Sequence, residues 1–231
     1  MVGVGIALLG LSALIAILTL VFADQTPGFT LSEEDAQRGL FGSAGFNSTF
    51  ALVFGIIGMA GEYKQGTITP TFLAAPQRWR VVVAKALAYA IGGFLLGLSS
   101  SLLVAGTSYV GLALRDIDIV MSASEVFELL GGNTATSAFY GIIGVAVGAV
   151  IPNQIAALIG ALVEQLIAEP LLFNFFPEQA RFLIGGAGSI LAGAPNLEVT
   201  LSLWAAAAVL AAWCAGLLSL GSLVTERKDV T

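Results

Sequence analysis

Long apolar runs dominate this 231-residue sequence, and only short polar segments separate them. A helix that crosses a bilayer needs roughly 20 consecutive, mostly apolar residues, and its backbone polar groups are satisfied within the helix. Only 10% of the residues are charged, whereas a soluble domain has about 25%. We therefore predict an all-α integral membrane protein in contact with membrane lipid, built as one transmembrane domain over residues 1–231.

Six runs are long enough to be transmembrane helices. The first three cover about Val4–Phe22, Leu40–Ala60, and Val81 to Val110 or Leu114. The last three cover about Ala135–Ile151, Gln154–Phe176 and Leu201–Val224, and the short segment Pro152-Asn153-Gln154 separates the fourth from the fifth.

The basic residues orient these predicted spans, because cytoplasmic loops carry an excess of Lys and Arg. If both termini and the segment Gly61–Arg80 are cytoplasmic, six of the nine basic residues lie inside: Lys64, Arg78, Arg80, Lys85, Arg227 and Lys228. The other three, Arg38, Arg115 and Arg181, then lie outside with most of the acidic residues. The net charge of -6 gives no basic footprint for nucleic acid, so we expect no nucleic-acid partner.

Two outer segments have predicted structures of their own. The segment Arg181–Pro195 is apolar and rich in glycine but too short to cross, so we expect it to enter the membrane from outside and return. Ser122 and Glu125 have the spacing of a capping box. They predict a short amphipathic helix at the outer interface, which Gly131-Gly132 should end.

Missing residue types exclude several kinds of chemistry. The sequence has no His and a single Cys, Cys214. This excludes Ser-His and Cys-His nucleophiles and the zinc sites that need His or paired Cys. No Gly-x-x-x-x-Gly-Lys-[Ser/Thr] motif occurs, so the chain has no P-loop for ATP. We predict no catalytic residue, no metal site and no enzymatic activity of its own.

Polar side chains inside the predicted spans are candidates for a transport pathway. Glu164 lies near the middle of the fifth span, beside Gln165. A charge there costs about 2.5–3.5 kcal/mol on insertion scales, so Glu164 should face the bundle interior or a cavity. Two readings stay open: a pathway or proton-coupling residue, and a protonated carboxyl hydrogen-bonded to a neighbouring helix. Asn47 and Ser100 are the other candidate pathway residues, whereas Glu169 is expected to be structural.

The polar segment Gly61–Arg80 carries the strongest functional signal in the sequence. It begins Gly61-Glu62-Tyr63-Lys64-Gln65-Gly66-Thr67, and we expect Gly66 to adopt a positive φ. Thr69 and Pro70 are suited to start a short helix that Pro76 would end, with Phe72 and Leu73 on its apolar face.

This segment resembles the first cytoplasmic loop of the type-2 ATP-binding-cassette (ABC) exporter permeases of bacteria. In that family a Glu, a basic residue two positions later and Gly-Thr precede a short helix and a basic turn. Glu62, Lys64 and Gly66-Thr67 match the first part, and residues 78–85 match the basic turn. The stretches 148–154 and 169–178 are similar to the same family's fourth and fifth spans.

The resemblance implies the membrane subunit of an exporter in the bacterial inner or plasma membrane. In the family, a cytoplasmic coupling helix between spans two and three docks on a separate ATPase subunit, present in two copies, which binds ATP and Mg²⁺. A second permease chain, identical or homologous, completes the pathway, and ATPase closure drives alternating access. The residues carried over to the coupling loop are Glu62, Tyr63, Lys64, Gly66, Thr67, Phe72, Leu73, Arg78 and Arg80.

One departure concerns the start of the sequence. Members of the family usually begin with a basic amphipathic helix before the first span, whereas this sequence opens with Met1-Val2-Gly3-Val4. Either such a segment precedes it, or the N-terminal contact with the ATPase is reduced.

Other function classes remain open from the sequence. One alternative is an ATP-independent secondary transporter or channel, with Glu164 as the proton-linked group. Another is a membrane scaffold or polytopic enzyme, and the lack of His and of paired catalytic residues argues against the enzyme.

Overall fold

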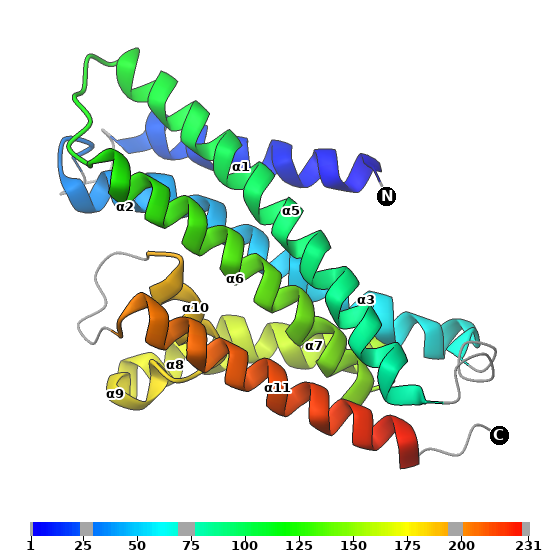
Figure 1. Ribbon diagram of the computed structural model, residues 1–231. Coiled ribbons are helices and arrows are strands. Elements are labelled where there is room, and N and C mark those ends of the chain that lie inside the picture. The colour runs from blue at the N-terminus through cyan, green and yellow to red at the C-terminus, as the bar shows by residue number, and fades with distance from the viewer. Residues whose placement is uncertain (1, 24–29, 69–76, 194–200, 228–231) are drawn as a thin grey trace.

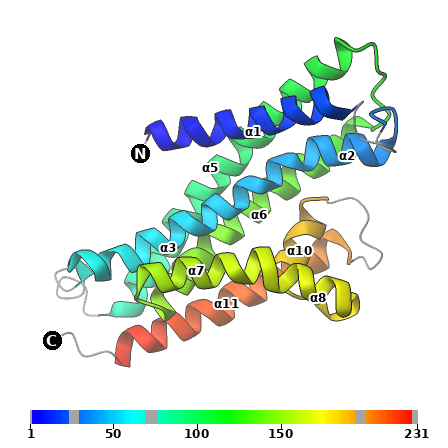
Figure 2. The same cartoon turned by 180° about the vertical axis from the view of Figure 1, so that it is seen from behind.

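The computed structural model describes residues 2–23, 30–68, 77–193 and 201–227. In these residues all regular secondary structure is helical. The long helices run between two ends of an elongated bundle, and the connections gather at those ends (Figure 1). Seen from behind, α1, α3 and α7 are the elements nearest the viewer (Figure 2).

Several helices follow one another almost without a break. α1 is Val2–Phe22. The next long helix combines α2 (Glu34–Gly42), a 3-10 turn (Ser43–Phe46) and α3 (Asn47–Gln65). α5 (Arg78–Ala113) and α6 (Ala123–Val150) follow. Then come α7 (Gln154–Val163), a π-helical turn (Glu164–Ala168) and α8 (Glu169–Phe175). The chain closes with α9 (Pro177–Ala180), α10 (Ile184–Leu191) and α11 (Leu203–Arg227).

Five helices among the described residues are long and apolar enough to cross a membrane: Glu34–Gln65, Arg78–Ala113, Ala123–Val150, Gln154–Phe175 and Leu203–Glu226. α1 contributes a further apolar stretch, Ala7–Phe22, which is shorter than these five. The prediction of an all-α membrane protein is confirmed at this level. The second to sixth predicted runs each coincide with one of the five helices.

The surface of α5 explains why the bundle needs lipid around it. Leu87, Ile91 and Leu95 repeat every four residues along one face and are 60%, 62% and 58% exposed. Leu102 continues the stripe. Soluble monomers rarely expose contiguous apolar patches of more than a few hundred Å². A stripe of this length along a helix of 36 residues is typical of a lipid-facing surface.

α6 is the central helix and packs along α3, α5 and α11. Glycines allow its close contacts, as small residues do between transmembrane helices. A Cβ atom on Gly93 of α5 would lie 2.3 Å from the Ser137 carbonyl oxygen of α6. A Cβ atom on Gly144 of α6 would lie 2.2 Å from the Leu52 carbonyl oxygen of α3. These glycine faces are therefore occupied by contacts within the chain.

The start of α6 confirms one prediction and corrects another. The capping box is present: the Glu125 amide donates to Ser122 Oγ at 3.3 Å, and the Ser122 amide donates to Glu125 Oε2 at 2.8 Å. The predicted short helix ending at Gly131-Gly132 is wrong, because α6 continues through both glycines. Gly132 instead admits α10, since a Cβ atom there would lie 1.8 Å from the Leu191 carbonyl oxygen.

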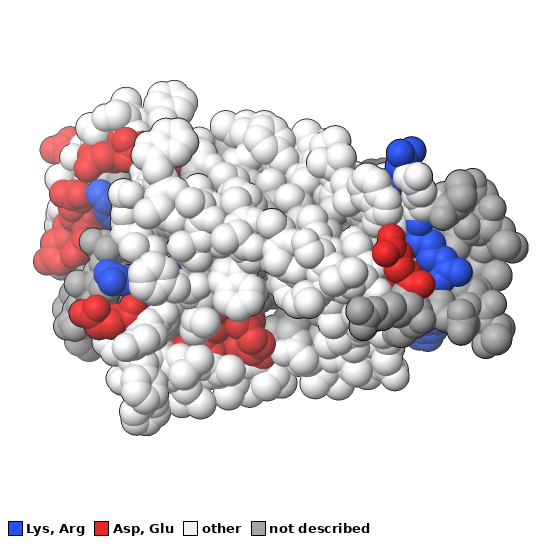
Figure 3. All heavy atoms as spheres, turned by 60° about the horizontal axis from the view of Figure 1, so that its bottom comes forward, with Lys and Arg blue, Asp and Glu red and all other residues white. Residues whose placement is uncertain are grey.

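Charge separates the two ends of the bundle. Figure 3 shows most acidic residues at one end, most basic residues at the other, and a largely uncharged band between them. We call the end at which α2 begins the acidic end, and the end at which α3 stops and α5 begins the basic end. α8 ends and α11 begins on the acidic side, so α9 and α10 leave and re-enter the bundle from that side (Figure 1). On α10, Ala187 and Leu191 are buried.

Candidate transport pathway and coupling surface

The helix Gln154–Phe175 changes its hydrogen-bonding pattern where its acidic residues lie. Residues Glu164–Ala168 form a π-helical turn, in which the Glu169 amide donates to the Glu164 carbonyl oxygen five residues earlier. In an α-helix, residues five apart point about 140° away from each other. The wider turn brings Glu164 and Glu169 closer to the same side of the helix. Single π-turns are frequent at functional sites.

Glu169 has an anchored and almost fully buried carboxyl group. Its side chain is only 3% exposed, and its Oε1 accepts a hydrogen bond from the Gly185 amide at 2.8 Å. The glycine is required for this approach, because a Cβ atom on residue 185 would collide with the carboxyl oxygen of Glu169. Glu169 thus connects α8 with the first turn of α10, and it also borders a cavity.

A cavity of about 550 Å³ lies beside this carboxyl group, between α2–α3, α6, α8 and α10. Its polar lining comes from Ser43, Ser48, Thr49, Thr136, Tyr140, Gln165, Glu169 and Ser189. Glycines on α2 and α10, together with Phe46 and Phe173, form much of the remaining wall. The volume falls in the range of about 300–1,000 Å³ that is usual for small-molecule sites. The residues from α2 place this cavity in the acidic half of the bundle.

A second cavity of about 290 Å³ adjoins the first on the side of the basic end. Glu164 lines it, together with Ile151 and Gly160 from the two sides of the α6–α7 connection. Tyr140 and Gln165 line both cavities and therefore separate them. Gln165 Nε2 donates to Thr49 Oγ1 at 3.0 Å, whereas its Oε1 is buried without a hydrogen-bond partner among the described residues.

The four candidate pathway residues do not all meet. Glu164 and Gln165 lie at the junction of the two cavities. Asn47 is buried elsewhere and donates to Ser12 Oγ of α1 at 2.6 Å. Ser100 is buried and donates to the Gly97 carbonyl oxygen of its own helix at 3.0 Å. Asn47 therefore links α3 to α1, and neither Asn47 nor Ser100 lines the two cavities.

At the basic end, α3 stops in a Schellman motif at Gly66. Gly66 has φ 70° and ψ 9°, the left-handed conformation that was predicted for it. The Thr67 amide donates to the Glu62 carbonyl oxygen at 3.0 Å, and the Gly66 amide donates to the Tyr63 carbonyl oxygen at 3.4 Å. This pattern satisfies the last carbonyl groups of the helix and directs the chain away from its axis.

The Glu62 carboxylate forms an ion pair with Lys85, a residue outside the predicted coupling set. Lys85 also donates to the Gly58 carbonyl oxygen at 2.8 Å. The two side chains are 17% and 27% exposed for Lys85 and Glu62, so the pair is mostly shielded by protein. α3 and α5, the helices on either side of the connection 66–77, are thereby held together.

The other described coupling residues divide into half-buried and exposed ones. Tyr63 is half-buried and packs against a core cluster that contains Ile68 and Val82. Arg78 Nη1 donates to the Thr225 carbonyl oxygen of α11 at 3.2 Å. Lys64, Gly66, Thr67 and Arg80 are exposed. Phe72 and Leu73, and with them the predicted coupling helix, lie outside the described residues.

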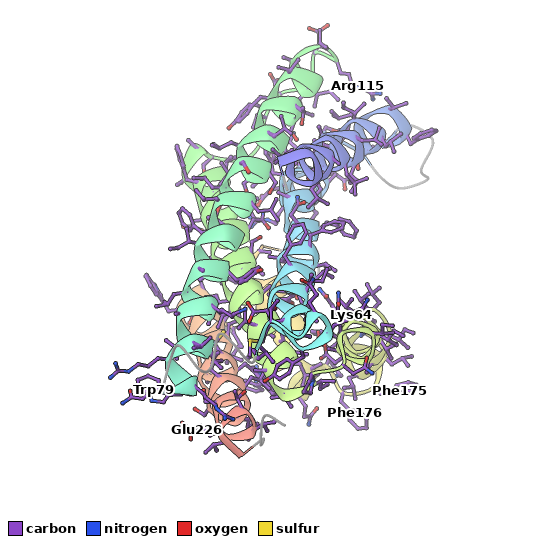
Figure 4. All side chains as sticks on the ribbon, turned by 90° about the vertical axis from the view of Figure 1, so that its right-hand side faces the viewer. Lys64, Trp79, Arg115, Phe175, Phe176 and Glu226 are labelled. Atoms are coloured by element: carbon purple, nitrogen blue, oxygen red, sulfur yellow. The ribbon has the colours of Figure 1, made fainter. Side chains whose placement is uncertain are left out.

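The basic end presents side chains from three helices to its surroundings. Figure 4 looks onto this end, with Lys64 at the end of α3, Trp79 at the start of α5 and Glu226 at the end of α11. Trp79 is 43% exposed, and the Arg80 guanidinium lies 5.5 Å from its ring centroid. Tryptophan and arginine side chains of this kind are common at the membrane–water interface.

Some residues of the site escaped the sequence prediction. Thr49, Thr136 and Tyr140 join the larger cavity from α3 and α6, and a single sequence gives no register between helices that would bring them together. Glu164 and Glu169 lie close to the same side of their helix only because of the π-turn between them. Pro170, which lacks an amide hydrogen, was the only local signal for irregular hydrogen bonding there.

The sequence was also compared with protein-family models and with curated proteins. No family model matches it, and no curated protein is similar enough to count as a match.

Proposed function

We propose that this protein is the membrane subunit of an ATP-driven exporter, of the type-2 ABC permease kind, in a bacterial inner or plasma membrane. In this proposal two permease chains, identical or homologous, work with two copies of a separate ATPase subunit that binds ATP and Mg²⁺. The observation that carries the transport part is the pair of adjoining cavities along α7 and α8. They follow the bundle from Ile151 to Gly39 and meet at Gln165 and Tyr140.

The two cavities suit alternating access. Their junction consists of two side chains, Gln165 and Tyr140, on helices that pack against different neighbours. A small shift of α7–α8 against α6 would join the cavities or separate them further. The π-turn makes such a shift easier, because its hydrogen-bonding register differs from that of the helix on either side.

The basic end supports the ATPase-coupled part of the proposal. The Gly66 cap and the Glu62–Lys85 ion pair fix both sides of the connection that resembles the coupling loop of exporter permeases. A displacement of that connection by the ATPase subunit would therefore move α3 and α5 together. α3 lines the larger cavity through Ser48 and Thr49, so a mechanical route from the loop to the cavity follows one helix.

The proposed topology has six spans, with α1 as the first and both termini in the cytoplasm. The basic end would then be cytoplasmic, as the positive-inside rule favours. α9 and α10 would form an outer re-entrant element, because the chain enters and leaves them on the acidic side. The burial of α10 against α6 and α11 supplies the protein surroundings that irregular backbone needs within a membrane.

The experiment is reconstitution of the complex purified through this chain. We expect an ATPase subunit with a P-loop to co-purify, and we expect its ATP hydrolysis in proteoliposomes to depend on the coupling loop. Gly66→Val and Glu62→Ala should leave the protein inserted but lower coupled hydrolysis and transport. Gly92→Ala is the matched control, because a Cβ atom there meets nothing within 4 Å. Absence of any ATPase, or unchanged activity in both coupling variants, would contradict the proposal.

A proton-coupled secondary transporter is the second candidate, and the positions of two acidic residues favour it. Glu169 borders the larger cavity and Glu164 lines the smaller one. Acidic residues inside membrane domains often mark proton relays. The purified chain alone, in proteoliposomes without an ATPase, would then accumulate substrate when a pH gradient is imposed. Glu164→Gln should abolish this uptake. Transport that needs ATP and ignores the gradient would remove this candidate.

A further inference from the structure

The larger cavity combines an apolar wall with one anchored acidic group. Glu169 is buried on its border, and Phe46 and Phe173 contribute aromatic rings. No Lys or Arg occurs among the described residues that line this cavity or its smaller neighbour. A buried carboxylate in a membrane domain is costly without a partner of opposite charge. The cavity therefore has an acidic group whose counter-ion the described part of the chain does not supply.

The larger cavity has a single acidic residue among the described residues that line it. This residue is Glu169, and the Gly185 amide holds its carboxyl group in place. The buried and unpartnered Oε1 of Gln165 adds an acceptor at the cavity junction. A ligand with a single positive charge matches this arrangement.

The shape of the site favours an organic cation over a metal ion. The described residues contain no group of three or more His, Cys, Asp or Glu side chains that could hold a metal. The cavity volume of about 550 Å³ suits a molecule with several rings or alkyl groups. The aromatic side chains of Phe46, Phe173 and Tyr140 on its wall could each attract a poorly hydrated cation through the ring face.

We propose that the larger cavity binds a hydrophobic organic monocation, such as a quaternary ammonium or phosphonium, with Glu169 as its counter-ion. We further propose that cations of this class are the cargo, a part that rests on the exporter function proposed above. The acidic end of the bundle, on the side where the cavity lies, would draw the released cation away from the site.

Binding is measured on the purified full-length chain in lipid nanodiscs, without an ATPase. The probe is radiolabelled tetraphenylphosphonium, with triphenylphosphine oxide as a neutral competitor of similar shape. We expect saturable binding that the neutral compound does not displace. The double variant Glu164→Gln/Glu169→Gln should bind about tenfold more weakly or worse. Glu128→Gln is the control, because it removes an exposed carboxylate of α6 that does not line the cavity. This variant should bind the probe as tightly as the wild-type protein.

The single variant Glu169→Gln guards against loss of folding, because its amide oxygen still accepts the Gly185 hydrogen bond. If the double variant does not fold, two other measurements test the proposal. One is probe binding to this single variant, and the other is the comparison of the charged with the neutral probe on the wild-type protein. Equal binding of the neutral probe, or wild-type affinity in folded Glu169→Gln, would overturn the proposal. So would an absence of saturable binding to the wild-type chain.

The result also separates this inference from the exporter proposal. Cation binding without any co-purifying ATPase would keep the site and reject the exporter. ATP-dependent activity with no cation binding would keep the exporter and reject this site. Only binding together with ATP-driven efflux of the same cation supports both.

Discussion

The Lys85 ammonium of α5 lies between the Glu62 carboxylate and the Gly58 carbonyl oxygen of α3, so one side chain ties together the two helices that flank the connection 66–77. Glu62 Oε2 is buried and has no hydrogen-bond partner among the described residues, which leaves Lys85 as the main compensation for this carboxylate. A shielded ion pair of this kind is costly to break from one side, because the remaining charge loses its partner.

Lys85→Met is expected to lower the free energy of unfolding by about 1–3 kcal/mol through the unpaired Glu62 carboxylate. Thermal unfolding in detergent measures the change. Glu62→Gln combined with Lys85→Met should recover part of the loss, since it removes the orphaned charge. Lys64→Gln, at an exposed position two residues after Glu62, should have little effect. A single Lys85 variant as stable as wild type would show that the pair contributes nothing.

Gly66→Ala is expected to destabilise the end of α3 by about 1–2 kcal/mol, because a side chain resists the left-handed φ of 70°. Space is not the cause, since a Cβ atom on Gly66 meets nothing within 4 Å. Gly66→Asn should therefore be tolerated better than Gly66→Ala, as Asn visits this conformation more readily. Equal stability of the two variants would contradict the backbone explanation.

Gly144→Ala and Gly92→Ala should change stability in opposite directions. At Gly144 a Cβ atom would lie 2.2 Å from the Leu52 carbonyl oxygen, so α3 and α6 would have to separate. At Gly92 no atom lies within 4 Å, and alanine favours a helix by about 0.5–1 kcal/mol over glycine. Melting temperatures of the two variants in the same detergent test this. Destabilisation by both would mean that the Gly92 face is covered, for example by a second chain.

How far the sequence predicts this fold depends on which physical signal each element carries. Transmembrane helices carry a strong one, since lipid requires long apolar runs, and five predicted runs coincide with helices that are long enough to cross. Helix ends were less certain. Gly131-Gly132 locally predicts the end of a helix. In the structure Gly132 instead gives room to the Leu191 carbonyl oxygen of α10. This is a tertiary contact, which the local sequence does not reveal.

The candidate site was only partly predictable for the same reason. The cost of a charge in the bilayer marked Glu164 as facing the interior, and the structure places it on a cavity. Its position on the same side of the helix as Glu169 depends on a π-turn. The 3.6-residue periodicity of an α-helix does not predict such a turn. Polarity also marked Asn47 and Ser100, but polarity does not tell a cavity from a helix–helix contact. Only the packing assigns these two residues to Ser12 and Gly97.

The orientation of the bundle is tested by labelling single cysteines in a Cys214→Ser background. We expect cysteines at Ser32 and Glu178, both exposed and on the acidic side, to react with an impermeant thiol reagent in intact cells. Cysteines at Gln65 and Glu226, exposed at the basic end, should react only after the membrane is opened. The reverse pattern would place the basic end outside and exclude its contact with a cytoplasmic ATPase.

Two variants of Glu164 distinguish a pathway residue from a structural one. Glu164→Gln keeps the size and polarity of the side chain, so folding should be preserved, but it removes the carboxyl group that lines the smaller cavity. If Glu164 lines the pathway, transport or cargo preference should change in this variant. Glu164→Leu also removes the polar group, and we expect the loss of its hydrogen-bonding capacity to destabilise the protein by about 1–3 kcal/mol.

The decisive comparison is therefore between function and stability across the same two variants. Thermal unfolding and transport are measured for Glu164→Gln and Glu164→Leu in one lipid composition. Unchanged transport in Glu164→Gln with unfolding of Glu164→Leu would assign this residue a structural role. That outcome would also weaken the proton-coupled alternative, because a glutamine cannot titrate. It would leave the cation site dependent on Glu169 alone, whose carboxyl group the Gly185 amide would still hold at the border of the larger cavity.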